Sequence, residues 1–317
     1  MAQTFAPILL FVYNRPIHTR RLIESLTQNV PAAYSELIIY SEHWRNEKER
    51  PQVEAVRNYV RTVTGFASVR IIEREENYGL AKNVIEAVTE TLFRYDRVIV
   101  LEDDLLLAPH FLQFMNDALE IYQDEPRVGH VHGCFFVDRP VPALSDSFFI
   151  KWAGSWGWAT WARAWKYFVP DANELLRQIE TNGRTYAFDF DGAYRYTRML
   201  RRQVRGEINS WAIRWYATLF LNDMLALNAG KSLVRNTGFD GSGTHCGDDN
   251  LYNRLSLYQE TLKINPATPI RENQTGRAAL TAYYKETYSF KNKLIRKLKQ
   301  KLWKTNWQTK KHGKTTG

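Results

Sequence analysis

The chain of 317 residues is 44% hydrophobic and 24% charged, a composition that excludes a disordered or fibrous protein and is typical of a globular one. This length is sufficient for one large domain or for two fused halves with a sizeable core. The formal net charge of +9 is concentrated after Glu286, where ten lysines and arginines occur without an acid, so that 33 basic and 34 acidic residues remain elsewhere. Because this remainder has no positive excess, we do not expect nucleic-acid binding.

The cysteines and the N-terminus bear on the cellular compartment. Cys134 and Cys246 are too few for a disulfide framework or a four-cysteine zinc site, although one disulfide between them remains open. The apolar run at residues 6–13 contains Pro7, is too short to span a bilayer and lacks the basic region of a secretion signal. We therefore expect a cytoplasmic protein without a transmembrane anchor.

Short apolar runs alternate with amphipathic stretches in the first hundred residues. The predicted strands lie at residues 7–13, 37–40, 69–72 and 97–101. The predicted helices lie at residues 19–27, 46–62 and 79–93. This alternation predicts an α/β fold with a Rossmann-like, mostly parallel sheet that helices cover on both faces.

Polar residues directly follow these predicted strands. They are Asn14, Arg15, Ser41, Glu42, the segment 76–79 and the acidic run Glu102, Asp103 and Asp104. The carboxyl ends of parallel strands meet at one edge of a sheet, where α/β proteins bind their ligands. We therefore expect the functional site at this edge.

The acidic run is the sharpest of these signals. Three adjacent carboxylates at the end of a buried strand repel one another unless a cation or hydrogen-bond donors offset their charge. Mg²⁺ and Mn²⁺ are bound by one or two carboxylates together with substrate phosphate oxygens. An acidic turn that caps the next helix is the alternative, but the place of the run at a strand end favours a functional site.

The second half of the chain is less regular. Helices are predicted at residues 109–122, 171–181, 190–204 and 211–226, and short strands at 128–133, 148–151 and 232–235. Trp158, Trp161 and Trp165 follow the spacing of a buried helix face and are assigned to the core. Four glycines between residues 237 and 248 predict a mobile loop that can approach phosphates closely.

Five segments occur in an informative order. They are PILLFVYNRPIHTRRL at 7–22, ENYGLAKN at 76–83, LEDDLLLAPHFL at 101–112, WGWATWARAW at 156–165 and the glycine-rich loop at 238–246. In this order they resemble the GT-A glycosyltransferases, most closely the N-acetylglucosaminyltransferase I type and its bacterial relatives. The resemblance implies a GT-A domain over residues 1–287, with a nucleotide-sugar half at about 1–105 and an irregular acceptor half at about 106–287.

The resemblance also implies an activity and residue roles. Such a hexosyl- or N-acetylhexosaminyltransferase moves a sugar from a nucleotide-sugar donor, here expected to be a UDP-sugar, to an acceptor hydroxyl with inversion of configuration. Asp104 would bind the Mn²⁺ or Mg²⁺ ion, and Glu102 and Asp103 would orient the ribose and the donor sugar. The other nucleotide-sugar-binding residues would be Asn14, Arg15, Glu42, Asn77, Trp156, Gly157 and His245.

Several of these residues could instead have structural roles. Arg15 could form a surface salt bridge, Asn77 could serve the turn before Gly79, and His245 could stabilise its own loop. Glu42 stands where relatives have an Asp that reads the uracil edge, and its extra methylene leaves the base open.

The catalytic base is not evident in the sequence. Many relatives have an acid beside the first Trp of the segment 210–215, and Ala212 stands at that position. Asp189, Asp191 and Asp240 are candidates for a displaced base. A different mechanism or an impaired enzyme also remains open.

Two other functions compete with this interpretation. A nucleotidyltransferase also uses acids after α/β strands, but the turn at residues 13–16 lacks the glycine run that such enzymes usually have. A nucleotide-sugar- or glycan-binding module without catalytic activity is consistent with the missing base.

Residues 288–317 have the pattern of a basic amphipathic helix. Phe290, Leu294, Leu298 and Leu302 recur every four residues, and lysines and arginines fill most positions between them. This pattern suits a helix in a membrane interface, although a disordered tail or a helix packed on the body also fits. We predict a peripheral protein on the inner face of a bacterial membrane that acts on a glycan or lipid-linked acceptor.

Overall fold

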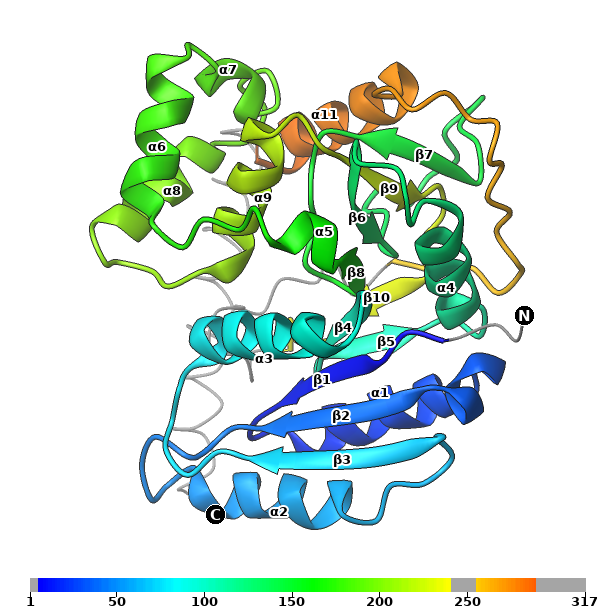
Figure 1. Cartoon of the computed structure of the whole chain (residues 1–317), viewed down its shortest axis with the longest axis vertical. Helices are drawn as coiled ribbons and strands as arrows, with labels where there is room; N and C mark the ends of the chain where they lie inside the picture. Colours follow the sequence, from blue (N-terminus) through cyan, green and yellow to red (C-terminus); the bar gives the residue numbers. More distant parts are fainter. Residues whose placement is uncertain (1–4, 241–254, 289–317) are drawn as a thin grey trace, which may run out of the picture.

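The computed structural model describes residues 5–240 and 255–288, which form an α/β protein around one large sheet (Figure 1). The sheet has the strand order β3-β2-β1-β4-β8-β6-β9-β7, and β10 pairs with β5 in a second sheet. The strands are β1 (Ile8–Val12), β2 (Glu36–Ser41), β3 (Ser68–Glu73), β4 (Arg97–Glu102), β5 (Leu105–Leu107), β6 (Val128–His132), β7 (Ser147–Ile150), β8 (Trp158–Trp161), β9 (Leu225–Ala229) and β10 (Val234–Asn236). The helices are α1 (Pro16–Thr27), the 3₁₀ helix η1 (Val30–Tyr34), α2 (Arg50–Val60), α3 (Leu80–Arg94), α4 (Phe111–Ile121), α5 (Ala162–Trp165), α6 (Ala172–Thr181), α7 (Thr185–Phe188), α8 (Tyr196–Val204), α9 (Trp211–Leu221) and α11 (Gln274–Tyr288).

The first four strands are parallel, as the alternation of strands and helices predicts. β1 pairs with both β2 and β4, so that Ile8 lies between Leu37 and Ile99. β3 pairs with β2 at the edge of the sheet and is only half-buried. The arrowheads of β1, β2 and β3 point to the same side of Figure 1, and the predicted site residues follow these ends.

Alternate side chains of β1 enter cores on opposite faces of the sheet. Ile8, Leu10 and Val12 pack with residues of α1, α2 and α4. Leu9 and Phe11 pack with residues of α3, α5 and α9. Because successive strand residues point to opposite faces, a strand that is apolar throughout requires helices on both faces. The fold class predicted from the sequence is confirmed.

The tryptophan segment is a strand followed by a short helix, where its spacing predicted one helix. β8 lies antiparallel between β4 and β6, and α5 begins directly after it. Trp158 and Trp161 are three positions apart in the strand and therefore enter opposite cores. Both are buried, as is Trp165, so their assignment to the core is confirmed although the predicted helix is wrong.

Two helices of the second half are shorter than predicted. α8 begins at Tyr196 because Phe190 and Asp191 have φ values of 53° and 55°, which are incompatible with a helix. α9 ends at Leu221, and Asp223 with a φ of 52° turns the chain into β9, a strand that the sequence did not predict. β9 is fully buried, and a short buried run cannot be assigned to strand or helix by periodicity.

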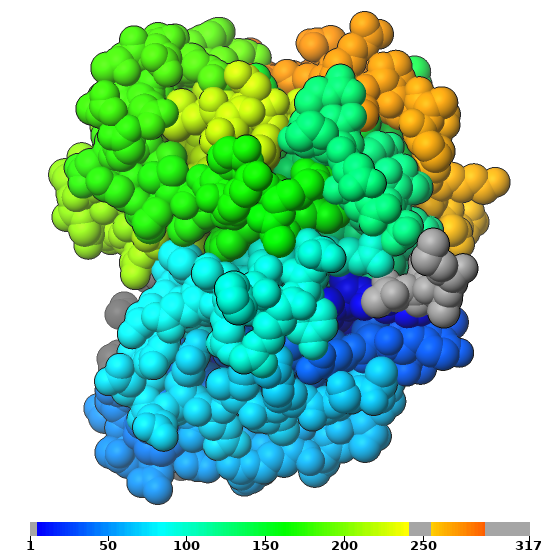
Figure 2. Space-filling model, in the orientation of Figure 1, coloured from blue at the N-terminus to red at the C-terminus, as the bar shows by residue number. Residues whose placement is uncertain are grey.

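The helices of the second half form a layer around β7 and β9. Residues of α6, α7, α8, α9 and α11 share one aromatic-rich core with Phe148 and Trp152. In the space-filling view this half, coloured green to orange, packs directly on the blue-to-cyan first half (Figure 2). In the part of the chain that the structure describes, no helix is long and apolar enough to cross a membrane. The predicted basic tail lies outside the described residues beyond Tyr288.

Candidate functional site

The acidic run lies where β4 ends, beside the carboxyl end of β1. Glu102 is the last residue of β4, and Asp103 and Asp104 form the turn into β5. Burial raises the pKa of Glu102 to about 8 and that of Asp103 to about 7, and repulsion from Asp104 adds to both shifts. Burial also raises the pKa of Asp104. Three acids whose charged forms are disfavoured in one small volume are typical of a functional site.

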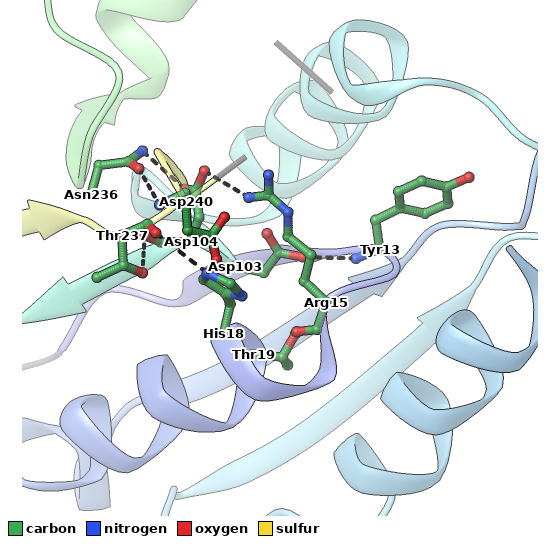
Figure 3. Close-up of polar contacts among 10 residues, drawn as sticks. Tyr13, Arg15, His18, Thr19, Asp103, Asp104, Asn236, Thr237 and Asp240 are labelled. Atoms are coloured by element: carbon green, nitrogen blue, oxygen red, sulfur yellow. Dashed lines mark hydrogen bonds and ion pairs between the residues drawn. The ribbon is translucent and has the colours of Figure 1, made fainter. Parts of the chain in front are cut away.

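Arg15 brings a positive charge to these acids from the turn after β1. Its Nη1 donates to Oδ2 of Asp104 at 3.1 Å, and both side chains are largely buried. The backbone N–H of Tyr13 donates to Oδ2 of Asp103 at 3.1 Å (Figure 3). Pro16 begins α1 directly after Arg15, and its fixed φ suits the first helical position. One guanidinium therefore offsets only part of the charge that three ionised carboxylates would carry.

The last residue of β10 and the residue that follows it bind Asp104 from the second half of the chain. Asn236 Nδ2 donates to Oδ1 of Asp104 at 3.1 Å. Thr237 donates to the Asp104 carbonyl from its N–H at 2.7 Å and from its hydroxyl at 2.9 Å. A Cβ on Gly238 would collide with the Asp104 carboxylate and with Arg15. A glycine at this position therefore lets the chain pass close to the ion pair.

His18 of α1 lies three positions after Arg15, and its side chain points towards the acidic run. Its Nε2 is 3.4 Å from the carbonyl oxygen of Thr237 and 3.2 Å from Oδ2 of Asp240 (Figure 3). Asp240 is the last described residue before the glycine-rich loop continues. Of the three candidate bases, Asp240 is the one that the structure brings next to the acidic run.

Asp189 and Asp191 contact other parts of the helical layer. Oδ1 of Asp189 accepts hydrogen bonds from the N–H of Thr197 at 2.6 Å and from its hydroxyl at 2.8 Å, at the start of α8. Asp191 forms an ion pair with Arg277 of α11 at 3.2 Å. Both carboxylates therefore stabilise the packing of α7, α8 and α11, away from Asp104.

α9 brings an indole to the acidic run. The side chain of Trp211 lies beside Glu102 and lowers the pKa of this acid, against the larger effect of burial. The Trp211 ring stacks on Trp158 with 4.8 Å between ring centroids. Ala212, at the position where the resembled family has an acid, packs half-buried against the same core. Trp211 is therefore the contact between α9 and the acids.

A second polar group lies after β2 and before α3. Glu42 is 6% exposed, and its Oε1 accepts from the N–H of His43 at 2.9 Å and from that of Tyr78 at 3.0 Å. Its Oε2 is buried without a hydrogen-bond partner among the described residues. Asn77 donates to the His43 carbonyl and so holds the turn, and Asn14 lies in the turn between β1 and α1. A buried acceptor without a donor is costly, and an N–H group of a ligand would satisfy it.

Trp156 and Gly157 lie at the entry to β8. Gly157 has a φ of 63°, and a Cβ there would lie 2.7 Å from a methyl group of Val234. This glycine therefore permits close packing on β10. Trp156 packs edge-on against Phe136 at 4.9 Å and against Phe239 at 5.7 Å. The indole thus lies beside the first residues of the glycine-rich loop.

The chemistry of the site fits a divalent cation that has only one protein ligand. Within residues 5–240 and 255–288, no group of three or more His, Cys, Asp or Glu side chains could hold a metal ion alone. A Mg²⁺ or Mn²⁺ ion that shares phosphate oxygens with its substrate needs only one or two carboxylates. Asp104 is suited to that role because a cation would favour its charged form, which burial disfavours. His245 and Cys246 lie outside the described residues, and Cys134 is a buried free thiol.

Four neighbours of the acidic run were not predicted from the sequence: His18, Asn236, Thr237 and Trp211. His18 had a usable signal, because residues three positions apart share one side of a helix. Asn236 and Thr237 directly precede the first glycine of the predicted loop. Trp211 had no such signal, since its contact with Glu102 depends on how α9 packs over the sheet.

No protein-family model and no curated protein matches the sequence. Among solved structures, S. aureus TarS shares 16% identity over 74% of this chain and 37% of its own length, with a TM-score of 0.39. The mannosyltransferase PcManGT from Pyrobaculum calidifontis, solved with GDP-Man and Mn²⁺, shares 13% identity over 70% of each chain, with a TM-score of 0.36. A cytidylyltransferase from Leptospira borgpetersenii shares 11% identity over 51% of this chain and 63% of its own, with a TM-score of 0.32. Similar structures thus include glycosyltransferases. Since a cytidylyltransferase also occurs among them, likeness at this level does not identify the reaction.

Proposed function

We propose that this protein is a metal-dependent glycosyltransferase that moves a hexose or N-acetylhexosamine from a nucleotide-sugar donor to an acceptor hydroxyl. The observation that carries the proposal is the meeting of three largely buried acids with Arg15 at the carboxyl ends of β1 and β4. This is the edge at which α/β proteins bind ligands. A guanidinium beside a cation site suits a diphosphate leaving group, because the negative charge that develops on the diphosphate must be stabilised.

The proposed donor is a UDP-sugar, and Glu42 is its base-reading residue. Two backbone N–H groups occupy Oε1, so one carboxylate oxygen remains to accept a hydrogen bond. Uracil offers a single imino N–H on this edge and matches one free acceptor. Guanine offers adjacent imino and amino donors, and cytosine has an acceptor at the same ring position, so both fit less well.

Asp104 is the proposed ligand of the Mn²⁺ or Mg²⁺ ion, which would neutralise charge on the leaving diphosphate. Arg15 already donates to Asp104, and the diphosphate would offer this guanidinium a second acceptor. Glu102 and Asp103 are proposed to accept hydrogen bonds from hydroxyl groups of the donor sugar and the ribose. These contacts would fix the anomeric carbon for attack.

Asp240 is the proposed base for the acceptor hydroxyl. Its Oδ2 lies 3.2 Å from His18, which would orient the carboxylate. A carboxylate that takes the hydroxyl proton increases the nucleophilicity of the attacking oxygen. Attack on the face opposite the diphosphate gives inversion, in agreement with the resemblance found in the sequence.

The decisive experiment incubates the full chain with UDP-, GDP-, CDP- and dTDP-sugars and Mn²⁺, and analyses the products. Slow release of UDP from a UDP-hexose or UDP-N-acetylhexosamine supports the proposal, because water can replace a missing acceptor. Release of pyrophosphate from a nucleoside triphosphate supplied with a sugar phosphate would identify a nucleotidyltransferase instead. Binding without turnover, even with acceptors present, would identify a binding module.

The basic segment after Tyr288 is proposed to hold the enzyme on the inner face of a bacterial membrane, next to a lipid-linked or glycan acceptor. Its apolar residues recur at helical spacing between cations, and each cation near an anionic leaflet adds about 1 kcal/mol. Flotation with anionic and neutral liposomes tests this, with a chain that ends at Thr287 as the comparison. Equal flotation of both chains, or no binding to anionic liposomes at low salt, would overturn the proposal.

A further inference from the structure

α8 and the two residues that flank it carry five arginines on one side. Successive residues of an α-helix are rotated by about 100°, which places these arginines within an arc of about 120° that contains no other side chain. They are Arg195, Arg198, Arg201, Arg202 and Arg205. The opposite side, with Thr197 and Leu200, is buried in the core of the helical layer. We name the five residues the arginine face.

Acidic side chains balance only part of the arginine face. Arg201 pairs with Glu180 at 2.7 Å, and two others share Glu207 at 3.1 and 2.5 Å. Arg195 and Arg198 are exposed, and no ion pair involves either of them in the described part of the chain. Five positive charges therefore meet two negative ones.

This arrangement is unfavourable for an isolated helix. Like charges three or four positions apart on a helix repel one another. A guanidinium binds phosphate and carboxylate groups through two parallel hydrogen bonds. An external ligand that carries several such anions would therefore relieve the repulsion along the whole face.

The C-terminal end of α8 is joined by a short connection to α9, whose first residue, Trp211, lies beside the acidic run. α8 ends at Val204, and seven residues later Trp211 lies beside Glu102 and lowers its pKa. In Figure 1, α8 and the segment that follows it lie on the side to which β1, β2 and β3 point. The nine residues of α8 span about 14 Å. A chain of sugars along this helix could thus present its end to the candidate site.

We propose that the arginine face binds an anionic acceptor glycan, whose carboxylate or phosphate groups pair with Arg195 and Arg198 while its terminal sugar enters the site. This inference rests on the proposed glycosyltransferase function. A neutral glycan would leave the guanidinium groups without counter-charges. Helices that bind membrane surfaces insert apolar side chains, and none lies within the arc of the arginine face. A soluble polyanion therefore fits this surface better than a lipid bilayer.

Fluorescently labelled dextran sulfate tests the proposal, with neutral dextran of the same length as the comparison. Binding to the full chain is measured by anisotropy at several salt concentrations for the wild type and for an Arg195→Gln/Arg198→Gln variant. The matched control is Arg94→Gln/Arg177→Gln, which removes two exposed arginines of α3 and α6. Because the basic C-terminal segment is present in all three proteins, its contribution cancels.

The double variant is expected to bind dextran sulfate about five-fold more weakly than the control, with a salt dependence shallower by about one to two ions. Equal affinities of variant and control would overturn the proposal. So would a loss of binding to anionic phospholipid vesicles without a loss of binding to dextran sulfate, which would indicate a membrane surface. If the wild type hydrolyses no donor, the proposed function fails, whereas weaker binding by the double variant still supports an anion-binding face.

Discussion

The guanidinium of Arg15 lies 3.1 Å from the carboxylate of Asp104, although the two residues are 89 positions apart in the sequence. The contact forms because β1 and β4 are adjacent parallel strands that end at the same edge of the sheet. Asn236 holds the second carboxylate oxygen of Asp104 from the other half of the chain. Asp104 therefore connects both halves of the protein at the proposed donor site.

Replacement of Asp104 by Ala is expected to abolish the part of the UDP affinity that depends on Mn²⁺, because no other described carboxylate is proposed to bind the ion. The fold should survive, since burial disfavours the charged form of this acid. Isothermal titration with UDP, with and without Mn²⁺, measures the effect. Asp117→Ala is the control, because burial also raises the pKa of Asp117 on α4. Unchanged UDP affinity in Mn²⁺ with a normal melting curve would contradict the proposed metal site.

The acidic run should make the ligand-free protein less stable as the pH rises. Glu102 and Asp103 have raised pKa values of about 8 and about 7, whereas an unfolded chain restores values near 4. Between about pH 4 and about pH 8 the folded state thus binds more protons, and its free energy of unfolding falls with increasing pH. We expect a decrease of several kcal/mol, because each unit of pKa difference corresponds to about 1.4 kcal/mol.

Urea denaturation at about pH 5 and about pH 8.5 measures this decrease. A Glu102→Gln/Asp103→Asn variant should lose most of it, because neither replacement side chain titrates. The control variant, Glu24→Gln/Asp124→Asn, changes exposed residues and should behave as the wild type does. A wild-type stability that increases over this range would show that the acids are not held in their neutral forms.

Trp211→Phe should slow sugar transfer or donor hydrolysis about ten-fold, because Phe keeps the stacking on Trp158 and loses the indole N–H that lowers the pKa of Glu102. The change should appear in kcat and shift the pH profile, since Glu102 loses a donor that favours its charged form. Trp165→Phe is a matched control. It removes the hydrogen bond from Nε1 to Thr89 at 2.9 Å in the same core, away from the acids. Equal rates for both variants would assign Trp211 a purely structural role.

Glu42→Gln should weaken UDP binding and improve CDP binding, because the amide can offer an N–H to the ring nitrogen of cytosine. The preference for UDP over CDP is expected to fall about ten-fold or more. Competition titrations with both diphosphates give the ratio directly. Glu73→Gln, which changes a partly exposed acid that pairs with Arg57 and Arg61, should leave it unchanged. A ratio unaffected by Glu42→Gln would mean that Glu42 does not read the base.

The order of apolar strands and amphipathic helices in the first hundred residues was sufficient to predict the parallel half of the sheet. β1 is apolar throughout, as are the central residues of β2 and β4, and such segments are stable only between two layers of helices. The polar residues that follow these strands could therefore be assigned to one edge. The structure brings Arg15, Asp103 and Asp104 together there.

Tertiary packing decided what the local pattern left undetermined. The spacing of Trp158 and Trp161 fits both a helix face and a strand buried on both sides, and pairing with β4 and β6 selects the strand. Whether Asp189 or Asp240 approaches the acidic run depends on the path of the chain between α7 and β10, which no short-range periodicity encodes. Sequence patterns indicate which residues are buried, because the hydrophobicity of each side chain can be read from the sequence itself. The partner of each buried or charged group depends on contacts between segments far apart in the chain, and these are fixed only when the whole core packs.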